Sequence, residues 1–132
     1  MRLLLDTHAL IWWLTGDRRL KASERGAIAD SESIVHVSAA SIWEIAFKES
    51  LGRINVQADL EREAEEDGFL ELPIRWRHAR AAGALPRHHE DPFDRMLVAQ
   101  ARIENLVSSA TIQPSETYDV TLLPESKHPR PR

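Results

Sequence analysis

Four acidic side chains of this chain stand beside segments with the character of a protein core. Asp6 directly follows the apolar run 3–5, and Glu44 lies in "SIWEIAF", which offers little other polar surface. Asp91 and Asp94 open an amphipathic stretch, "DPFDRMLVAQA". Burying an ionised carboxylate without a partner is costly, so each of these acids needs a group that offsets the cost.

A divalent cation is the partner that these residue types favour. Carboxylates that lie together repel and raise each other's pKa unless a cation sits among them. Mg²⁺ and Mn²⁺ are hard ions that prefer oxygen ligands. We therefore expect Asp6, Asp91 and Asp94 to be metal ligands. Glu44 is expected either to bind the ion as well or to orient the water that acts as nucleophile.

Each of these acids also has a structural interpretation. Asp6 could end the strand or cap the helix that follows it, and Glu44 could be an ordinary exposed helix residue. Asp91 precedes a proline and is a good N-cap, and Asp94 then falls where an acid favours the helix dipole. Capping does not exclude ligation, because residues at i and i+3 share one helix face.

The elements that would position these acids alternate in the manner of βαβ units around a parallel sheet. Binding sites in such sheets form beyond the carboxyl ends of the strands, where Asp6 and the start of the Glu44 helix must lie. Asp91 and Asp94 join them if their helix points its N-terminus to the same edge. The predicted strands are 2–5, 34–37, 69–72, 106–109 and 120–123, and the predicted helices are 8–15, 23–30, 39–50, 57–67, 75–83 and 92–104.

Composition narrows the class of protein. The chain has 132 residues, 42% hydrophobic and 29% charged, which suits one soluble domain with a real core. No apolar run approaches the roughly 18 residues of a membrane span, and we expect no signal peptide and a cytoplasmic location. The absence of cysteine excludes disulfides and thiolate chemistry. A net charge of −4 gives no general attraction to nucleic acid, so any phosphate-binding surface must be local.

Three motifs in order, "LLLDTHALIWWL", "VSAASIWEIAFKESLGRI" and "LPRHHEDPFDRMLVAQA", resemble those of the PIN-domain nucleases, specifically the VapC toxins of type II toxin-antitoxin systems. The resemblance implies an α/β fold, a Rossmann-like three-layer α/β/α sandwich with a central, mostly parallel sheet of about five strands over residues 1–123. Residues 124–132 are expected to be a disordered tail. The resemblance also implies RNA cleavage with Mg²⁺ or Mn²⁺ held by Asp6, Glu44, Asp91 and Asp94, a cognate antitoxin, and a homodimer.

One part of the chain departs from the family pattern. A Val-Thr-x-Asp segment normally supplies a fourth acid after the next strand, but this chain reads "NLVSSATIQPSETYDV". Either Ala110 or Ile112 takes the place of that acid, depending on the alignment. Losing one carboxylate weakens a divalent site. The alternative function is therefore a PIN-fold protein that binds its antitoxin but has weakened or lost nuclease activity.

Other residues are candidates for contact with RNA. Ser108 and Ser109, at the end of a strand, could hold a metal-bound water by hydrogen bonds. His88 and His89 are adjacent on a loop and are expected to pack or to contact phosphate rather than to bind the hard ion. The arginines around the third motif could meet phosphates. These arginines are Arg75, Arg77, Arg80, Arg87 and Arg95.

Two further interpretations concern Asp6 and three of the tryptophans. An acid after the first strand also opens the sites of haloacid-dehalogenase-like phosphatases, in which Asp6 would be a nucleophile. Those sites place a second Asp two positions later, where this chain has His8, so we reject that class. Trp12, Trp13 and Trp43 fall on apolar helix faces and are expected to serve the core or a subunit interface rather than base stacking.

Overall fold

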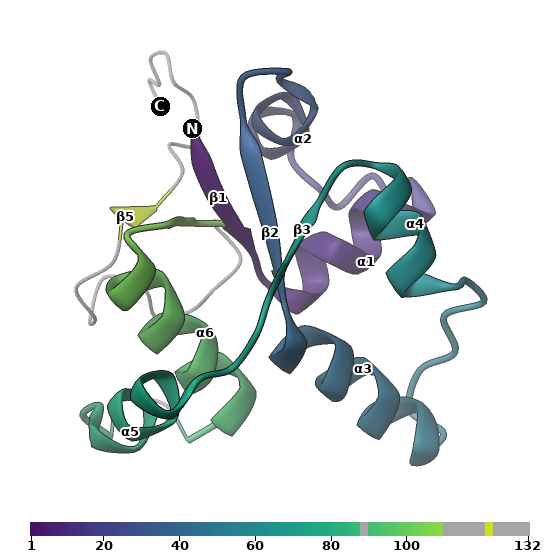
Figure 1. The fold of residues 1–132 in the computed structure, drawn as a ribbon. Helices are drawn as coiled ribbons and strands as arrows, with labels where there is room; N and C mark the ends of the chain where they lie inside the picture. The colour runs from purple at the N-terminus through teal and green to yellow at the C-terminus, as the bar shows by residue number, and fades with distance from the viewer. Residues whose placement is uncertain (88–89, 110–120, 123–132) are drawn as a thin grey trace.

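The computed structural model describes residues 1–87, 90–109 and 121–122. Its centre is a five-stranded sheet with the strand order β3-β2-β1-β4-β5, in which every neighbouring pair is parallel (Figure 1). The elements in chain order are β1 (Arg2–Leu5), α1 (Thr7–Thr15), α2 (Ala22–Ala29), β2 (Ile34–Ser38), α3 (Ala39–Ser50), α4 (Leu60–Glu66), β3 (Leu70–Leu72), α5 (Trp76–Ala84), α6 (Pro92–Glu104), β4 (Val107–Ser108) and β5 (Thr121–Leu122).

Helices cover both faces of the sheet because the side chains of β1 alternate between them. Leu3 and Leu5 join a buried cluster with residues of α1, α2 and α4. Leu4 joins a second cluster, built mainly by α6 and the chain after α5. Figure 1 shows α1, α2 and α4 on one side of the strands and α5 and α6 on the other. The predicted three-layer α/β/α sandwich is confirmed.

Local capping chemistry sets where the helices begin. The hydroxyl of Ser38 accepts a hydrogen bond from the Ala40 amide at 2.9 Å, so α3 follows β2 without a loop. Helix α4 begins later than the predicted residue 57, because Asp59 is its N-cap. None of the helices in the described ranges is long and apolar enough to cross a membrane. The predicted tail, 124–132, lies outside the described residues.

The direction of α6 decides which acids share an edge of the sheet. Gln100 accepts a hydrogen bond from the Ser38 hydroxyl at 2.6 Å and donates one to the Pro73 carbonyl at 3.2 Å. These contacts hold α6 at the carboxyl ends of β2 and β3. Phe93, near its start, packs edge-on against Trp43 of α3 with 4.9 Å between ring centroids. Helix α6 therefore begins at the carboxyl edge of the sheet, as the site hypothesis required.

A buried histidine ties α5 to α6. The Arg75 amide donates to His78 Nδ1 at 3.0 Å, which leaves the proton on Nε2. His78 Nε2 then donates to Glu104 at 2.8 Å, and Arg77 donates to the same carboxylate oxygen at 2.9 Å. The hydrogen bond from His78, supported by Arg77, holds the pKa of Glu104 below its ordinary value.

The pKa of Glu104 predicts how pH acts on stability. The pKa of Glu104 is lower in the folded chain than its ordinary value of 4.5, so the carboxylate contributes its full stabilisation above pH 4.5. That contribution is lost as pH falls through the lowered pKa of the folded chain. We expect Glu104→Gln to lower the free energy of unfolding by about 1 kcal/mol at neutral pH. In denaturant titrations the difference from wild type should shrink in more acidic buffer. A difference that is constant with pH would contradict this role.

Candidate active site

Asp6 is buried at the end of β1, where its carboxylate bonds both to the start of α1 and to Ser109. Its Oδ1 caps α1 by accepting from the Ala9 amide at 3.0 Å, and it also accepts from the Ser109 hydroxyl at 2.8 Å. The side chain is only 4% exposed. Within the described ranges no hydrogen bond reaches Oδ2, and His8 Nδ1 lies 3.9 Å from it. Asp6 is thus both a helix cap and a buried carboxylate, with one oxygen that no hydrogen bond from the described residues engages.

Glu44 lies beside this acid because Thr7 links them. Thr7 follows Asp6 directly and donates its hydroxyl to Glu44 Oε1 at 2.6 Å. Its Oγ1 also lies 3.1 Å from Ser41 Oγ, one turn before Glu44 on α3. Lys48 Nζ lies 2.6 Å from Glu44 Oε2. Both carboxylate oxygens are therefore fixed in position, and Lys48 offsets the buried charge.

Removing the charge of Lys48 should destabilise the fold. Lys48→Met leaves the carboxylate of Glu44 buried with a single hydroxyl donor, and we expect the free energy of unfolding to fall by about 2 kcal/mol. Arg62→Met is the matched control, because Arg62 and Glu66 form an exposed pair at the same i,i+4 spacing. That variant should change stability by less than about 0.5 kcal/mol. Equal effects of the two substitutions in urea titrations would refute the buried role of Lys48.

Asp91 and Asp94 lie at the beginning of α6. Asp91 is its N-cap, with Oδ1 accepting from the Phe93 amide at 2.8 Å and from the Asp94 amide at 3.3 Å. Across residues 1–87, 90–109 and 121–122, no three acidic or histidine side chains are close enough together to hold a metal ion. The structure therefore joins the end of β1 to Glu44 through Thr7, but the four predicted acids do not form a group of three that could hold a metal ion.

The length of α6 explains this separation. Gln100 is level with the end of β2, and Asp94 lies six residues earlier, or roughly 9 Å farther along the helix axis. The start of α6 thus projects beyond the sheet. Asp94 is four residues before Val98 and seven before Ala101, which are both buried in the core cluster between α6 and the sheet. Asp94 therefore lies on the sheet-facing side of the helix, in the part that projects beyond the sheet, here called the rim.

The two predicted serines differ in what they contact. Ser109 bonds to Asp6 twice: its hydroxyl donates to Oδ1 at 2.8 Å and accepts from the Asp6 amide at 3.2 Å. Ser108 turns its hydroxyl to the backbone carbonyl of Ser109, at 3.2 Å, and is fully buried. Ser109 belongs to the surroundings of Asp6, whereas Ser108 serves the local backbone.

Comparison with known proteins identifies the family of this fold. Residues 3–109 match the sequence model of the PIN domain family. The chain belongs to the PIN domain family. PIN domains are in general nucleases that depend on divalent metal ions. A search of curated protein sequences finds no match.

Solved structures agree with the PIN fold. One is a toxin-antitoxin complex from Klebsiella pneumoniae, at 18% identity and a TM-score of 0.59, with 86% of this chain and 88% of that chain covered. Another is VapBC2 from Rickettsia felis bound to a DNA fragment from their promoter, at 11% identity and a TM-score of 0.62, with 92% and 97% covered. At these identities the likeness is one of fold.

Arg95 ties α6 to the end of α5 and to the turn that follows it. Its guanidinium donates to backbone carbonyls at the end of α5 and in the following turn, at distances between 2.8 and 3.3 Å. The acceptors are the carbonyls of Ala82, Gly83, Leu85 and Pro86. The residue is 8% exposed. We therefore no longer consider Arg95 a contact for RNA phosphate.

The remaining predicted phosphate contacts near the third motif include Arg87, His88 and His89. Arg87 is exposed and pairs with Glu90 at 3.2 Å, so it stays a candidate phosphate contact. His88 and His89 lie outside the described residues, as do Ala110 and Ile112 at the place of the missing acid.

Sequence reasoning missed the residues that fix Glu44. Lys48 carried a usable signal, because an acid four residues before a lysine on a helix favours an ion pair. Thr7 and Ser41 carried none, since a hydroxyl next to a buried acid is recognisable only once α1 and α3 are known to pack together.

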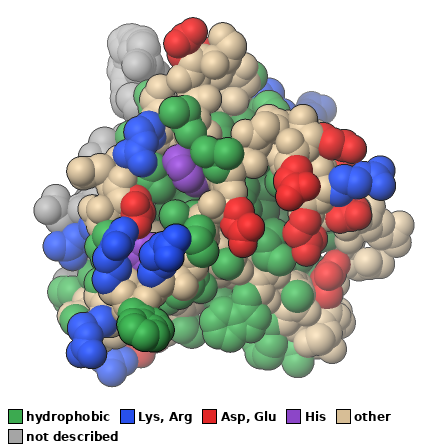
Figure 2. Space-filling model, in the orientation of Figure 1, with side chains coloured by type: hydrophobic (Ala, Val, Ile, Leu, Met, Phe, Trp, Pro, Cys, Tyr) green, Lys and Arg blue, Asp and Glu red, His purple; other side chains and the backbone are tan. Residues whose placement is uncertain are grey.

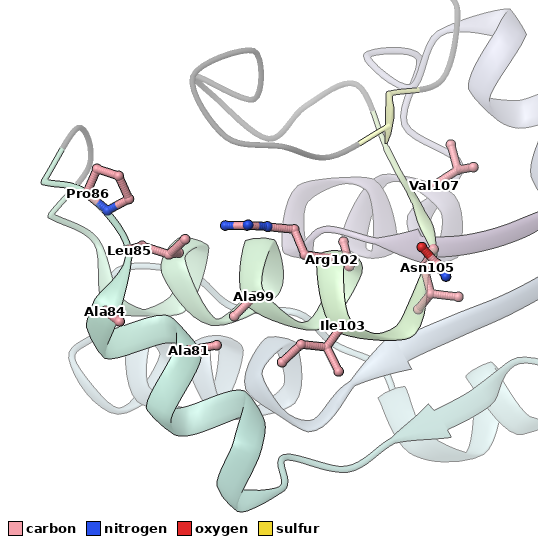
Figure 3. Close-up of a pocket in the computed structure, with 11 residues that line it drawn as sticks. Ala81, Ala84, Leu85, Pro86, Ala99, Arg102, Ile103, Asn105 and Val107 are labelled. Atoms are coloured by element: carbon pink, nitrogen blue, oxygen red, sulfur yellow. The ribbon is translucent and has the colours of Figure 1, made fainter.

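A separate cavity of about 580 Å³ lies between α5, α6 and the start of β4 (Figure 3). Figure 3 shows Ala81 and Ala84 from α5 facing Ala99 and Ile103 from α6, with Arg102 beside them. No acidic residue is among those that line it in the described part of the chain. This cavity is therefore distinct from the acid pair at Asp6 and Glu44.

Proposed function

We propose that this PIN domain is a metal-dependent endoribonuclease toxin of the VapC type, which hydrolyses RNA phosphodiester bonds and is neutralised by a cognate antitoxin. The observation that carries the proposal is the buried carboxylate of Asp6, whose Oδ2 accepts no hydrogen bond from the described residues, joined through the next residue, Thr7, to the buried carboxylate of Glu44. Hard oxygen donors of this kind fit Mg²⁺ or Mn²⁺. Mg²⁺ in particular usually keeps several waters and takes only one or two carboxylates from the protein.

The residues of the chain have distinct tasks in this reaction. When bound, the metal polarises the phosphoryl oxygens and lowers the pKa of its water. Asp6 would hold it through Oδ2, while the Ala9 amide and the Ser109 hydroxyl keep the carboxylate from turning. Glu44 would hold the ion or orient the attacking water. Asp91 and Asp94 would act from the rim, through the water ligands of the ion.

The alternative function has one observation in its favour. Among the described residues no three acidic or histidine side chains lie close enough together to hold a metal ion, and the family's fourth acid is replaced by Ala110 or Ile112. A site with fewer carboxylates binds a divalent ion less tightly. The second candidate is therefore a PIN-fold protein that keeps its antitoxin partner and cleaves RNA weakly or not at all.

A hollow of about 370 Å³ between α3, α4 and β3 supports the proposal of an antitoxin partner. Apolar side chains of Ile42, Trp43 and Phe69 line it. Three acids, Glu61, Glu65 and Glu71, line it as well. Figure 2 shows acidic side chains gathered on one half of this face, beside hydrophobic ones. A partner segment with apolar and basic side chains would match this surface.

An apolar stripe on α3 supports the proposal of a homodimer. Trp43, Phe47 and Leu51 follow one another at i, i+4 and i+8, and each is exposed by about half. Contiguous apolar surface of this kind marks protein contacts. Phe47→Glu should then yield monomers in sedimentation-velocity runs where the wild type sediments as a dimer. A wild type that is monomeric at high micromolar concentration would contradict the homodimer.

Cleavage of RNA by the isolated protein tests the proposed activity. Protein free of antitoxin would be incubated with single-stranded RNA that carries a fluorophore and a quencher, in Mg²⁺, in Mn²⁺ and in EDTA. We expect cleavage with either metal and none in EDTA. Absence of cleavage in both metals, from a folded protein, would contradict the nuclease and favour the antitoxin-binding alternative.

A cytoplasmic location follows from an RNA substrate of this kind.

A further inference from the structure

Three side chains, His8, Trp12 and Arg19, contact one another in a row that begins two residues after Asp6. We call this row the ladder. The ring of His8 is 5.7 Å from that of Trp12, centroid to centroid, with 41° between their planes. Arg19 continues the ladder, with its Cζ 5.2 Å from the centre of the Trp12 ring. The His8 side chain is 60% exposed. Its outer face is therefore available to a planar ligand.

Asp17 holds the far end of this ladder in place. Its carboxylate accepts from Arg19 Nε at 3.1 Å and from Arg19 Nη2 at 2.7 Å. Hydrogen bonds from Arg19 lower the pKa of Asp17 to about 2, so the pair is fully ionised at neutral pH. The ladder therefore carries little net charge, and affinity for a ligand would come from stacking rather than from attraction to phosphate.

The position of His8 connects the ladder with the acid pair. His8 Nδ1 lies 3.9 Å from Asp6 Oδ2, the oxygen through which Asp6 is proposed to hold the metal ion. Within one nucleotide, only a ribose separates the base from its phosphate. A nucleotide whose phosphate lies at Asp6 can therefore reach the exposed face of His8 with its own base or the next one.

We propose that the His8 ring, backed by Trp12 and Arg19, is a stacking platform for an unpaired nucleobase next to the phosphate held at Asp6. This inference rests on the proposed ribonuclease function and adds to it one side chain of this chain, His8, that would contact an unpaired base of the substrate. Aromatic side chains stack well on unpaired bases, because every base presents a π-face. Bases inside a duplex already stack on their neighbours and cannot use the platform.

Equilibrium binding in Ca²⁺ separates the platform from catalysis, because Ca²⁺ also takes carboxylate oxygens as ligands and replaces the Mg²⁺ or Mn²⁺ on which the proposed cleavage depends. The probe is a fluorescein-labelled single-stranded RNA decamer, measured by anisotropy beside the same sequence as a duplex. We expect His8→Ala to weaken binding of the single strand by about tenfold and to leave binding of the duplex unchanged. His8→Phe, which keeps an aromatic ring and loses the ring nitrogens, should bind within about twofold of wild type.

Trp76→Ala is the matched control, because Trp76 is 95% exposed on α5 and is not part of the ladder. It should bind the single strand as wild type does. Thermal melts should show that His8→Ala folds normally, since His8 is exposed. The platform is refuted if His8→Ala binds the single strand like wild type, if His8→Phe is as weak as His8→Ala, or if single strand and duplex weaken equally.

The two proposals fail in different ways. If the platform holds but the ribonuclease does not, the variants differ in binding while Mn²⁺ produces no cleavage by wild type. If the ribonuclease holds but the platform does not, wild type cleaves RNA while His8→Ala binds the single strand unchanged. A platform that serves a protein partner instead would give this second result.

Discussion

Asp6→Asn should abolish metal-dependent RNA cleavage while leaving the fold intact. The substitution removes the negative charge that faces the open ligand position, and a metal ion contributes several kcal/mol to such a reaction. We therefore expect the cleavage rate to fall at least about a hundredfold. Asparagine caps helices as well as aspartate does, so α1 should keep its N-cap and the melting temperature should change little.

Asp59→Asn is the matched control for this experiment. Asp59 is also an N-cap, with its carboxylate accepting from the Arg62 amide at 3.3 Å, but it is exposed and begins α4. Asp59→Asn should cleave RNA at the wild-type rate under the same conditions. Cleavage by Asp6→Asn within a few-fold of wild type would mean that Asp6 is only a helix cap.

Replacement of Arg95 should have the largest effect on stability. Arg95→Met keeps most of the apolar stem but removes the donors for the carbonyls at the end of α5, which lie in a buried region. Unsatisfied buried acceptors cost about 1 to 3 kcal/mol each, with partial relaxation. We expect the free energy of unfolding to fall by about 3 kcal/mol in urea titrations.

Arg87→Met supplies the comparison, since Arg87 is exposed and pairs only with Glu90 in the described part of the chain. It should change stability by less than about 0.5 kcal/mol. If instead Arg95→Met unfolds like wild type and loses RNA affinity, the guanidinium is a phosphate contact, as the sequence first suggested.

The topology could be predicted because two signals agreed along the chain. Leu3, Leu4 and Leu5 are apolar on both faces, as a central parallel strand must be, and the stretches between strands have helical periodicity. The same regularity placed Asp6 at the carboxyl edge of the sheet. The N-cap role of Asp91 could also be predicted, because capping depends only on the nearest few residues.

Distances across the fold could not be predicted. Neither the direction of α6 nor how far it extends beyond β2 could be read from the sequence, and the acids at its start were expected to join Asp6 and Glu44 if the helix began at the same edge. The bonds of Gln100 to Ser38 and Pro73 set that distance. Arg95 was misjudged for a related reason, since the backbone carbonyls that need donors are known only once α5 and α6 are packed together.

Crystals grown in Mn²⁺, with anomalous diffraction data, would test the central claim most directly. That claim is that Asp6 is a buried metal ligand rather than a capping residue alone. The account predicts an anomalous peak within coordination distance, roughly 2.0–2.3 Å, of Asp6 Oδ2, with further ligands that are mainly water. A peak held elsewhere in the molecule, or no peak at this edge of the sheet at saturating Mn²⁺, would contradict it.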